Sequence, residues 1–173
     1  MRASPFPAVL CLLASVSAWG QAPVVENAYV AIVPAGTADV DSVIGLQRGV
    51  EIVLCQSGIR QRFDGSPGKA ELKIVASLTK ADFVVDAPRR QVVRECELTD
   101  VTATLPDGVK IELPGTAITT RSGMPAGNAE SFFVACGANF ARTALDALRD
   151  KLAVRGSSCV EQPAVQPVKK KRK

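Results

Sequence analysis

The chain has 173 residues, 47% of them hydrophobic, and a formal net charge of +4. It contains no histidine, which excludes Ser-His-Asp triads, Cys-His nucleophiles and histidine-ligated metal sites. The positive charge lies at the two ends, because residues 21–168 carry fifteen basic and seventeen acidic residues. A mildly acidic body offers no basic groove for a nucleic acid.

The first twenty residues have the organisation of a secretory signal peptide. Arg2 precedes an uncharged apolar run, Ala8–Ala18, which is too short to cross a hydrocarbon core of about 30 Å as a helix and ends in small residues. Cleavage after Ala18 or after Gly20 fits this pattern. A buried helix would need a polar face, and a lipid anchor would need a cysteine nearer the exit than Cys11. We therefore expect residues 1–20 to be removed and the protein to be periplasmic or secreted.

The mature chain opens with alternating strand and helix patterns. Residues 24–33 and 59–63 are predicted strands, the first rich in β-branched residues and the second alternating. Between them, apolar residues at helical spacing predict a helix from Asp39 or Asp41 to about Gln56. A turn follows at residues 64–68, where aspartate, glycine, serine and proline cluster.

The next segment combines a second helix pattern with a strand pattern. Leu72, Val75 and Leu78 recur at a spacing of three, which predicts a short helix over residues 69–80. Residues 82–86 are a predicted strand.

The clearest β pattern is a hairpin over residues 101–113. Its two alternating arms flank Pro106-Asp107-Gly108, a sequence that favours a tight turn. The first arm is expected to start near Gln91, with a bulge around residues 98–100 where the alternation slips. Residues 117–120 are expected to continue the second arm.

The last helix pattern runs from an Asn128 cap to about residue 154, and Gly137 within it indicates close packing against another element. Together these elements predict an α+β fold with a mainly antiparallel sheet, a central hairpin and helices packed on one face. Residues 21–158 would form one domain, and residues 159–173 a disordered basic tail.

Four cysteines remain after removal of the leader. An even number in an oxidising compartment predicts two disulfides, with three pairings that the sequence does not separate. The alternative is four small buried apolar residues. The candidates are Cys55, Cys96, Cys136 and Cys159.

Neither a cofactor site nor a metal site is expected from the remaining residues. Three carboxylate pairs could in principle support hydrolysis, but such pairs are usually solvated strand or loop residues. They are Asp39 with Asp41, Asp82 with Asp86, and Glu95 with Glu97.

The chain ends in a run of positive charge. On an exported protein, such a tail is either simply solvated or makes weak contact with anionic lipid. The run consists of Lys169, Lys170, Lys171, Arg172 and Lys173.

Three segments together resemble small bacterial envelope domains of the curli-secretion and penicillin-binding-protein-activator lipoprotein type. They are Ala81–Ala87 (ADFVVDA), Glu97–Leu113 (ELTDVTATLPDGVKIEL) and the helix end Ala144–Ala153 (ALDALRDKLA). The resemblance implies an α/β sandwich and a non-enzymatic assembly or regulatory role. This chain departs from the group in having no lipid-acceptor cysteine and no amphipathic transmembrane hairpins.

We therefore expect an exported, non-enzymatic accessory protein of the cell envelope that acts through contact with a protein partner. The alternatives are a secreted, disulfide-stabilised effector or inhibitor and a carboxylate-based hydrolase. A deep pocket with clustered acids would favour the hydrolase, and an uncovered helix face or sheet edge would favour protein contact.

Overall fold

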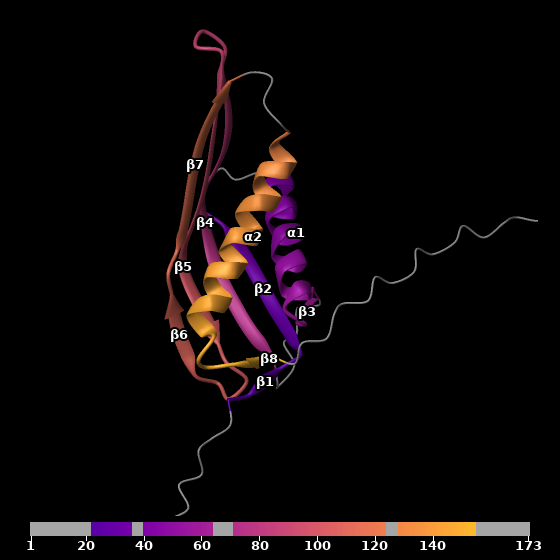
Figure 1. Cartoon of the computed structure of the whole chain (residues 1–173). Coiled ribbons are helices and arrows are strands. Elements are labelled where there is room, and N and C mark those ends of the chain that lie inside the picture. Colours follow the sequence, from indigo (N-terminus) through magenta and orange to yellow (C-terminus); the bar gives the residue numbers. More distant parts are fainter. Residues whose placement is uncertain (1–21, 36–39, 64–70, 124–127, 155–173) are drawn as a thin grey trace, which may run out of the picture.

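The computed structural model describes residues 22–35, 40–63, 71–123 and 128–154. It is an α+β structure in which both helices lie on one face of the main sheet, as predicted (Figure 1). The predicted signal peptide at residues 1–20, the turn predicted at residues 64–68 and the tail predicted at residues 159–173 lie outside the described residues. The elements are β1 (Val24–Val25), β2 (Asn27–Pro34), α1 (Val40–Gln56), β3 (Arg60–Arg62), β4 (Leu72–Asp86), β5 (Gln91–Thr104), β6 (Lys110–Leu113), β7 (Thr116–Gly123), α2 (Ala129–Leu148) and β8 (Ala153–Val154).

The main sheet is mixed, whereas the sequence predicted a mainly antiparallel one. Its order is β3-β2-β4-β5-β6, and β7 also pairs with β5. β2 is parallel to β3 and β4, while β4–β5, β5–β6 and β5–β7 are antiparallel. The parallel part arises because α1 returns the chain along the sheet between β2 and β3, which a hairpin cannot do. The central hairpin is β4–β5, and the hairpin predicted at residues 101–113 forms the edge.

The helix predicted over residues 69–80 is wrong, because this segment begins β4. Every second residue from Leu72 to Leu78 is buried, and the residues between them are partly exposed. This alternation is the two-residue period of a strand. Val75, which completed the helical spacing, therefore points to the opposite face from Leu72.

Strand β5 has two successive partners along one side. It starts at Gln91, and a register shift together with the positive φ of Asp100 (50°) confirms the predicted bulge. The turn after it closes with a hydrogen bond from the Leu105 N–H to the Val109 carbonyl at 2.8 Å. β6 and β7 run in the same direction beside β5, so residues 117–120 continue the second arm as predicted.

The two helices approach each other closely through glycines. A Cβ on Gly49 would lie 2.0 Å from the Val134 carbonyl oxygen, and one on Gly137 would lie 2.0 Å from that of Leu46. Either distance is far below van der Waals contact, so both positions require glycine unless the helices move apart. The close packing predicted at Gly137 is confirmed.

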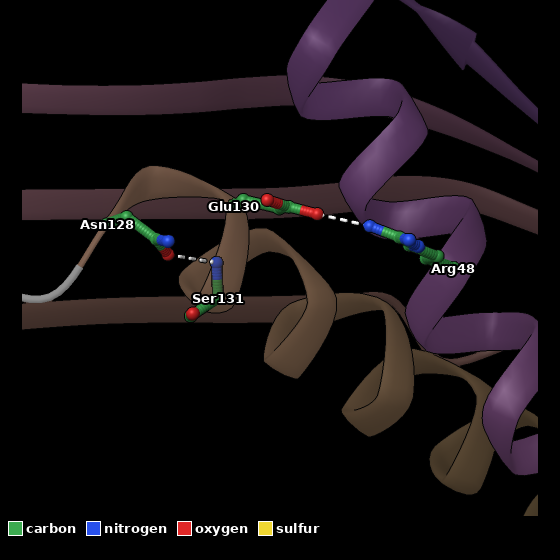
Figure 2. Close-up of polar contacts among 4 residues, drawn as sticks. All are labelled: Arg48, Asn128, Glu130 and Ser131. Atoms are coloured by element: carbon green, nitrogen blue, oxygen red, sulfur yellow. Dashed lines mark hydrogen bonds and ion pairs between the residues drawn. The ribbon is translucent and has the colours of Figure 1, made fainter.

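Helix α2 begins as predicted and ends earlier than predicted. The Asn128 side-chain oxygen accepts a hydrogen bond from the Ser131 N–H at 2.8 Å (Figure 2), which satisfies one of the free amides of the first turn. The helix ends at Leu148, because the Lys151 N–H bonds back to the Leu148 carbonyl at 2.9 Å and the chain then turns.

The residues after this turn form β8, which pairs in parallel with β1 through Val24 and Ala153. The Ala153 N–H also donates to the Pro23 carbonyl at 3.0 Å. The first and last described segments therefore lie side by side, at the opposite end of the molecule from the β4–β5 turn (Figure 1).

Candidate interaction site

Beyond Leu78 the sheet narrows to three strands. β2 stops at Pro34, opposite Leu78, whereas β4 continues and includes the strand predicted at residues 82–86. β5 returns beside it, and β7 pairs with the same part of β5. Figure 1 shows the β4–β5 turn projecting beyond both helices. We call this part of the sheet the distal ribbon, which consists of Thr79–Asp86, Gln91–Leu98 and Thr116–Gly123.

Residues 87–90 reverse the chain at the end of the ribbon. Arg90 has a φ of 51°, and its N–H donates to the Ala87 carbonyl at 3.1 Å. The Asp86 carboxylate accepts from the Arg89 N–H at 3.3 Å and pairs with the Arg89 guanidinium at 3.6 Å. All of these bonds lie within the turn itself.

Apolar side chains are exposed next to this turn. Val84 is 55% exposed and Val85 is 52% exposed, and adjacent strand residues point to opposite faces. Arg89 and Arg90 beside them are also exposed. These four residues are called the tip surface. Arginine is enriched in the interfaces between proteins, and exposed apolar groups next to it can supply their buried centre.

Both long edges of the distal ribbon lack a strand partner among the described residues. β7 pairs only with β5, and β4 has no second partner beyond Leu78. β7 (TAITTRSG) contains no proline, and Arg121 is its single charged residue. Edges of this length are commonly blunted by prolines, lysines or bulges, so β7 in particular retains the capacity to add a further strand.

The two predicted carboxylate pairs that the structure describes in full, Asp82 with Asp86 and Glu95 with Glu97, form no enclosed acidic site. Asp82 lies opposite Glu95 across the strands, and Glu97 pairs with Lys80 at 3.7 Å on a surface open to solvent. Asp39 lies outside the described residues. Over the described ranges, no group of three or more cysteine, aspartate or glutamate side chains is placed to hold a metal.

A hollow of about 510 Å³ lies between the first turns of α1 and α2. Its acidic residues, Asp41 and Glu130, belong to those first turns, where negative charge complements the positive end of a helix. Glu130 also forms an ion pair and hydrogen bond with Arg48 across the two helices (Figure 2). The arrangement has a structural explanation that involves no ligand.

Cys96 and Cys136 are free thiols buried between β5 and α2, so their predicted assignment to disulfides is wrong for this structure. The pKa of Cys96 is raised well above its ordinary value. The main cause is the hydrogen bond with the Cys136 thiol, and burial is the second cause. The pair fills the core as small apolar groups do. It thereby connects the distal ribbon to α2.

The remaining predicted residues are not brought together by the described structure. Cys55 lies at the end of α1 and is disulfide-bonded, so its predicted assignment to a disulfide is confirmed. Cys159, one candidate for its partner, and the basic run Lys169–Lys173 lie outside the described residues, so the pairing of Cys55 and lipid contact by the tail stay predictions. Neither of the described helices has the length and apolarity to cross a membrane.

Sequence reasoning found pieces of the distal ribbon but missed it as a site. The missed signal is the two-residue alternation that begins at Leu72 and resumes after an irregularity between Leu78 and Lys80. A strand of 15 residues exceeds the usual 3–10. Interpreting residues 72–86 as one strand would have indicated that this strand projects beyond its neighbours.

Comparison with known proteins identified no matching family model and no matching curated protein. Among solved structures, the PelC dodecamer from Paraburkholderia phytofirmans has a TM-score of 0.43 at 15% identity, over 69% of this chain and 86% of that one. A minor lipoprotein from Acinetobacter baumannii has a TM-score of 0.43 at 12% identity, over 78% and 100% of the two chains. A lipoprotein from Neisseria meningitidis has a TM-score of 0.39 at 10% identity, over 71% and 99%.

Two of these three solved structures are bacterial lipoproteins, and none of the three is named as the curli-secretion or penicillin-binding-protein-activator type. With all three TM-scores below 0.5, these similarities assign the chain to no family.

Proposed function

We propose that this chain is an exported, non-enzymatic accessory protein of the cell envelope that contacts a protein partner through the tip surface of the distal ribbon. Export is supported by the leader pattern of residues 1–20. The observation that carries the contact is the exposure of Val84 and Val85, 55% and 52%, on a turn that projects beyond the helices (Figure 1).

A carboxylate-based hydrolase has less support. Of its predicted acids, Asp82 and Glu95 lie opposite each other on the open face of a strand, and Asp41 lines the hollow beside Glu130 in the first turns of the two helices. Catalytic carboxylates owe their separate pKa values to enclosed and unequal environments, and neither Asp82 nor Glu95 lines the hollow between the helices.

Site-specific photocrosslinking in the native envelope tests this proposal. A photoreactive residue at Val85 is expected to give a discrete crosslinked product. Ile52 is the matched control, since it is also an exposed aliphatic residue (45%) but lies on α1. The product should disappear when Val84 and Arg90 are replaced by serine without loss of folding.

Two results would contradict the proposal. One is no product from Val85, and the other is the same product from Ile52, which would indicate nonspecific proximity.

A further inference from the structure

The two edges of the distal ribbon are complementary to each other. The free stretch of β4, Thr79–Asp86, and the strand β7, Thr116–Gly123, have the same number of residues and lie on opposite sides of β5. Both are antiparallel to β5, so they run in the same direction. A second molecule in the same orientation could place its β4 beside β7 as a parallel partner.

The cross-strand register places opposite charges at the same level of the two edges. Arg121 on β7 is paired with Val93, and Val93 is paired with Val84 on β4. Asp82 and Asp86 lie two residues to either side of Val84, on the same face as Val84. An arginine level with Val84 of a neighbouring copy would thus lie diagonally between two carboxylates, within reach of its long side chain.

The charges on this face are incompletely neutralised within one copy. Asp82 lies directly opposite Glu95, and like charges in that position destabilise a sheet. Among the ion pairs of the described residues, Lys80 pairs with Glu97 and Arg89 with Asp86; none includes Asp82, Glu95 or Arg121. A neighbouring Arg121 would supply the counter-charge.

We propose that β7 of one copy adds to the Thr79–Asp86 stretch of a second copy. The contact is head-to-tail, because it joins two different edges, so every copy keeps one edge for a further copy and the contact can repeat. This inference deepens the proposed function by naming a second copy as the partner of the ribbon edges. Strand addition uses the backbone of Thr79–Asp86, so the side chains of Val84 and Val85, which point to the two faces of the ribbon, remain available to another protein.

The test measures assembly of the purified, processed protein by sedimentation velocity over a concentration series. The wild type is expected to assemble beyond a dimer, because each added copy leaves one ribbon edge free. Arg121→Asp and Asp82→Arg should each raise the concentration for half-assembly by at least about tenfold, because like charges then meet across the contact. The double variant should recover most of the assembly.

Hydrogen exchange locates the contact. Amides of β7 and of Thr79–Asp86 should become more protected as the protein concentration rises. Amides of β6, Lys110–Leu113, are the control and should not change, since β6 is an edge segment outside the ribbon. Circular dichroism checks that each variant folds.

The proposal is overturned if the wild type stays monomeric throughout the series or stops at a dimer. It is also overturned if the single variants assemble like the wild type, if the double variant fails to recover, or if protection grows at β6 instead. A monomeric result would leave a crosslink from Val85 to a different protein unaffected, so failure of the self-assembly and failure of the tip contact are distinguishable.

Discussion

The two halves of the sheet are stabilised by different means. In the proximal half, β2, β3 and the first part of β4 lie under the helices, and Leu72, Ile74 and Leu78 are 0–2% exposed. In the distal half, β4 loses its β2 partner, and two consecutive valines are more than half exposed. The distal half still contributes Cys96 and Leu98 to the core, so it is the exposed tip that can present side chains at little cost to stability.

Truncating one apolar side chain of the helix-covered core and one at the tip of the distal half gives the largest expected difference. Phe140 is 1% exposed in the core, so Phe140→Ala should lower the free energy of unfolding by about 3–5 kcal/mol. Val85→Ala at the tip should change it by less than about 0.5 kcal/mol. Urea denaturation measures both, and equal losses would refute the division into two halves.

Adding a methyl group to one glycine at the contact between the helices and to one in the distal half is the next test. Gly137→Ala should cost about 1–3 kcal/mol, because the new Cβ would meet the Leu46 backbone at 2.0 Å and overpacking strains the core. Gly123→Ala at the end of β7 should be nearly neutral, since nothing lies within 4 Å of its Cβ position. A thermal melt that ranks the two variants in the reverse order would contradict the close helix contact.

The smallest expected effect is on the pH dependence of stability. It arises from the thiols of Cys96 and Cys136, which lie between the distal ribbon and α2. The pKa of Cys96 is raised in the folded protein, so the folded state keeps this proton above pH ~8.5, where an unfolded thiol ionises. Stability should therefore fall as the pH rises above that value, by at most about 1.4 kcal/mol per pH unit from this group.

The control for this effect is Cys96→Ala, which should weaken the fall in stability between about pH 8.5 and 10.5. Parallel slopes for the wild type and the variant would show that Cys96 ionises equally in both states. The slopes are compared instead of the absolute stabilities, because loss of the sulfur also changes packing.

Elements with local signals were predicted well from the sequence. The Asn128 cap, the start of β5 at Gln91 and the bulge at Asp100 each depend on residues close together in the chain. The α+β class and the placement of the helices on one face of the sheet were also predicted from these patterns. Such features need no knowledge of what packs against them.

Features decided by distant contacts were predicted poorly. The first half of β4 has apolar residues compatible with either period, and pairing with both β2 and β5 decides for the strand. The thiols of Cys96 and Cys136 meet because β5 and α2 pack together, which no spacing reveals. The distal ribbon is a site only because β2 stops at Pro34 while β4 does not.

The pairing of β1 with β8 gives the molecule a polarity. Because Pro23 and Ala153 are hydrogen-bonded to each other, the described chain enters and leaves at one pole, and the β4–β5 turn lies at the other (Figure 1). Attachment of either terminus to a surface in the envelope, or to a bead through an affinity tag, would hold the molecule at the pole where β1 and β8 pair. The other pole would then face outward and remain free to bind.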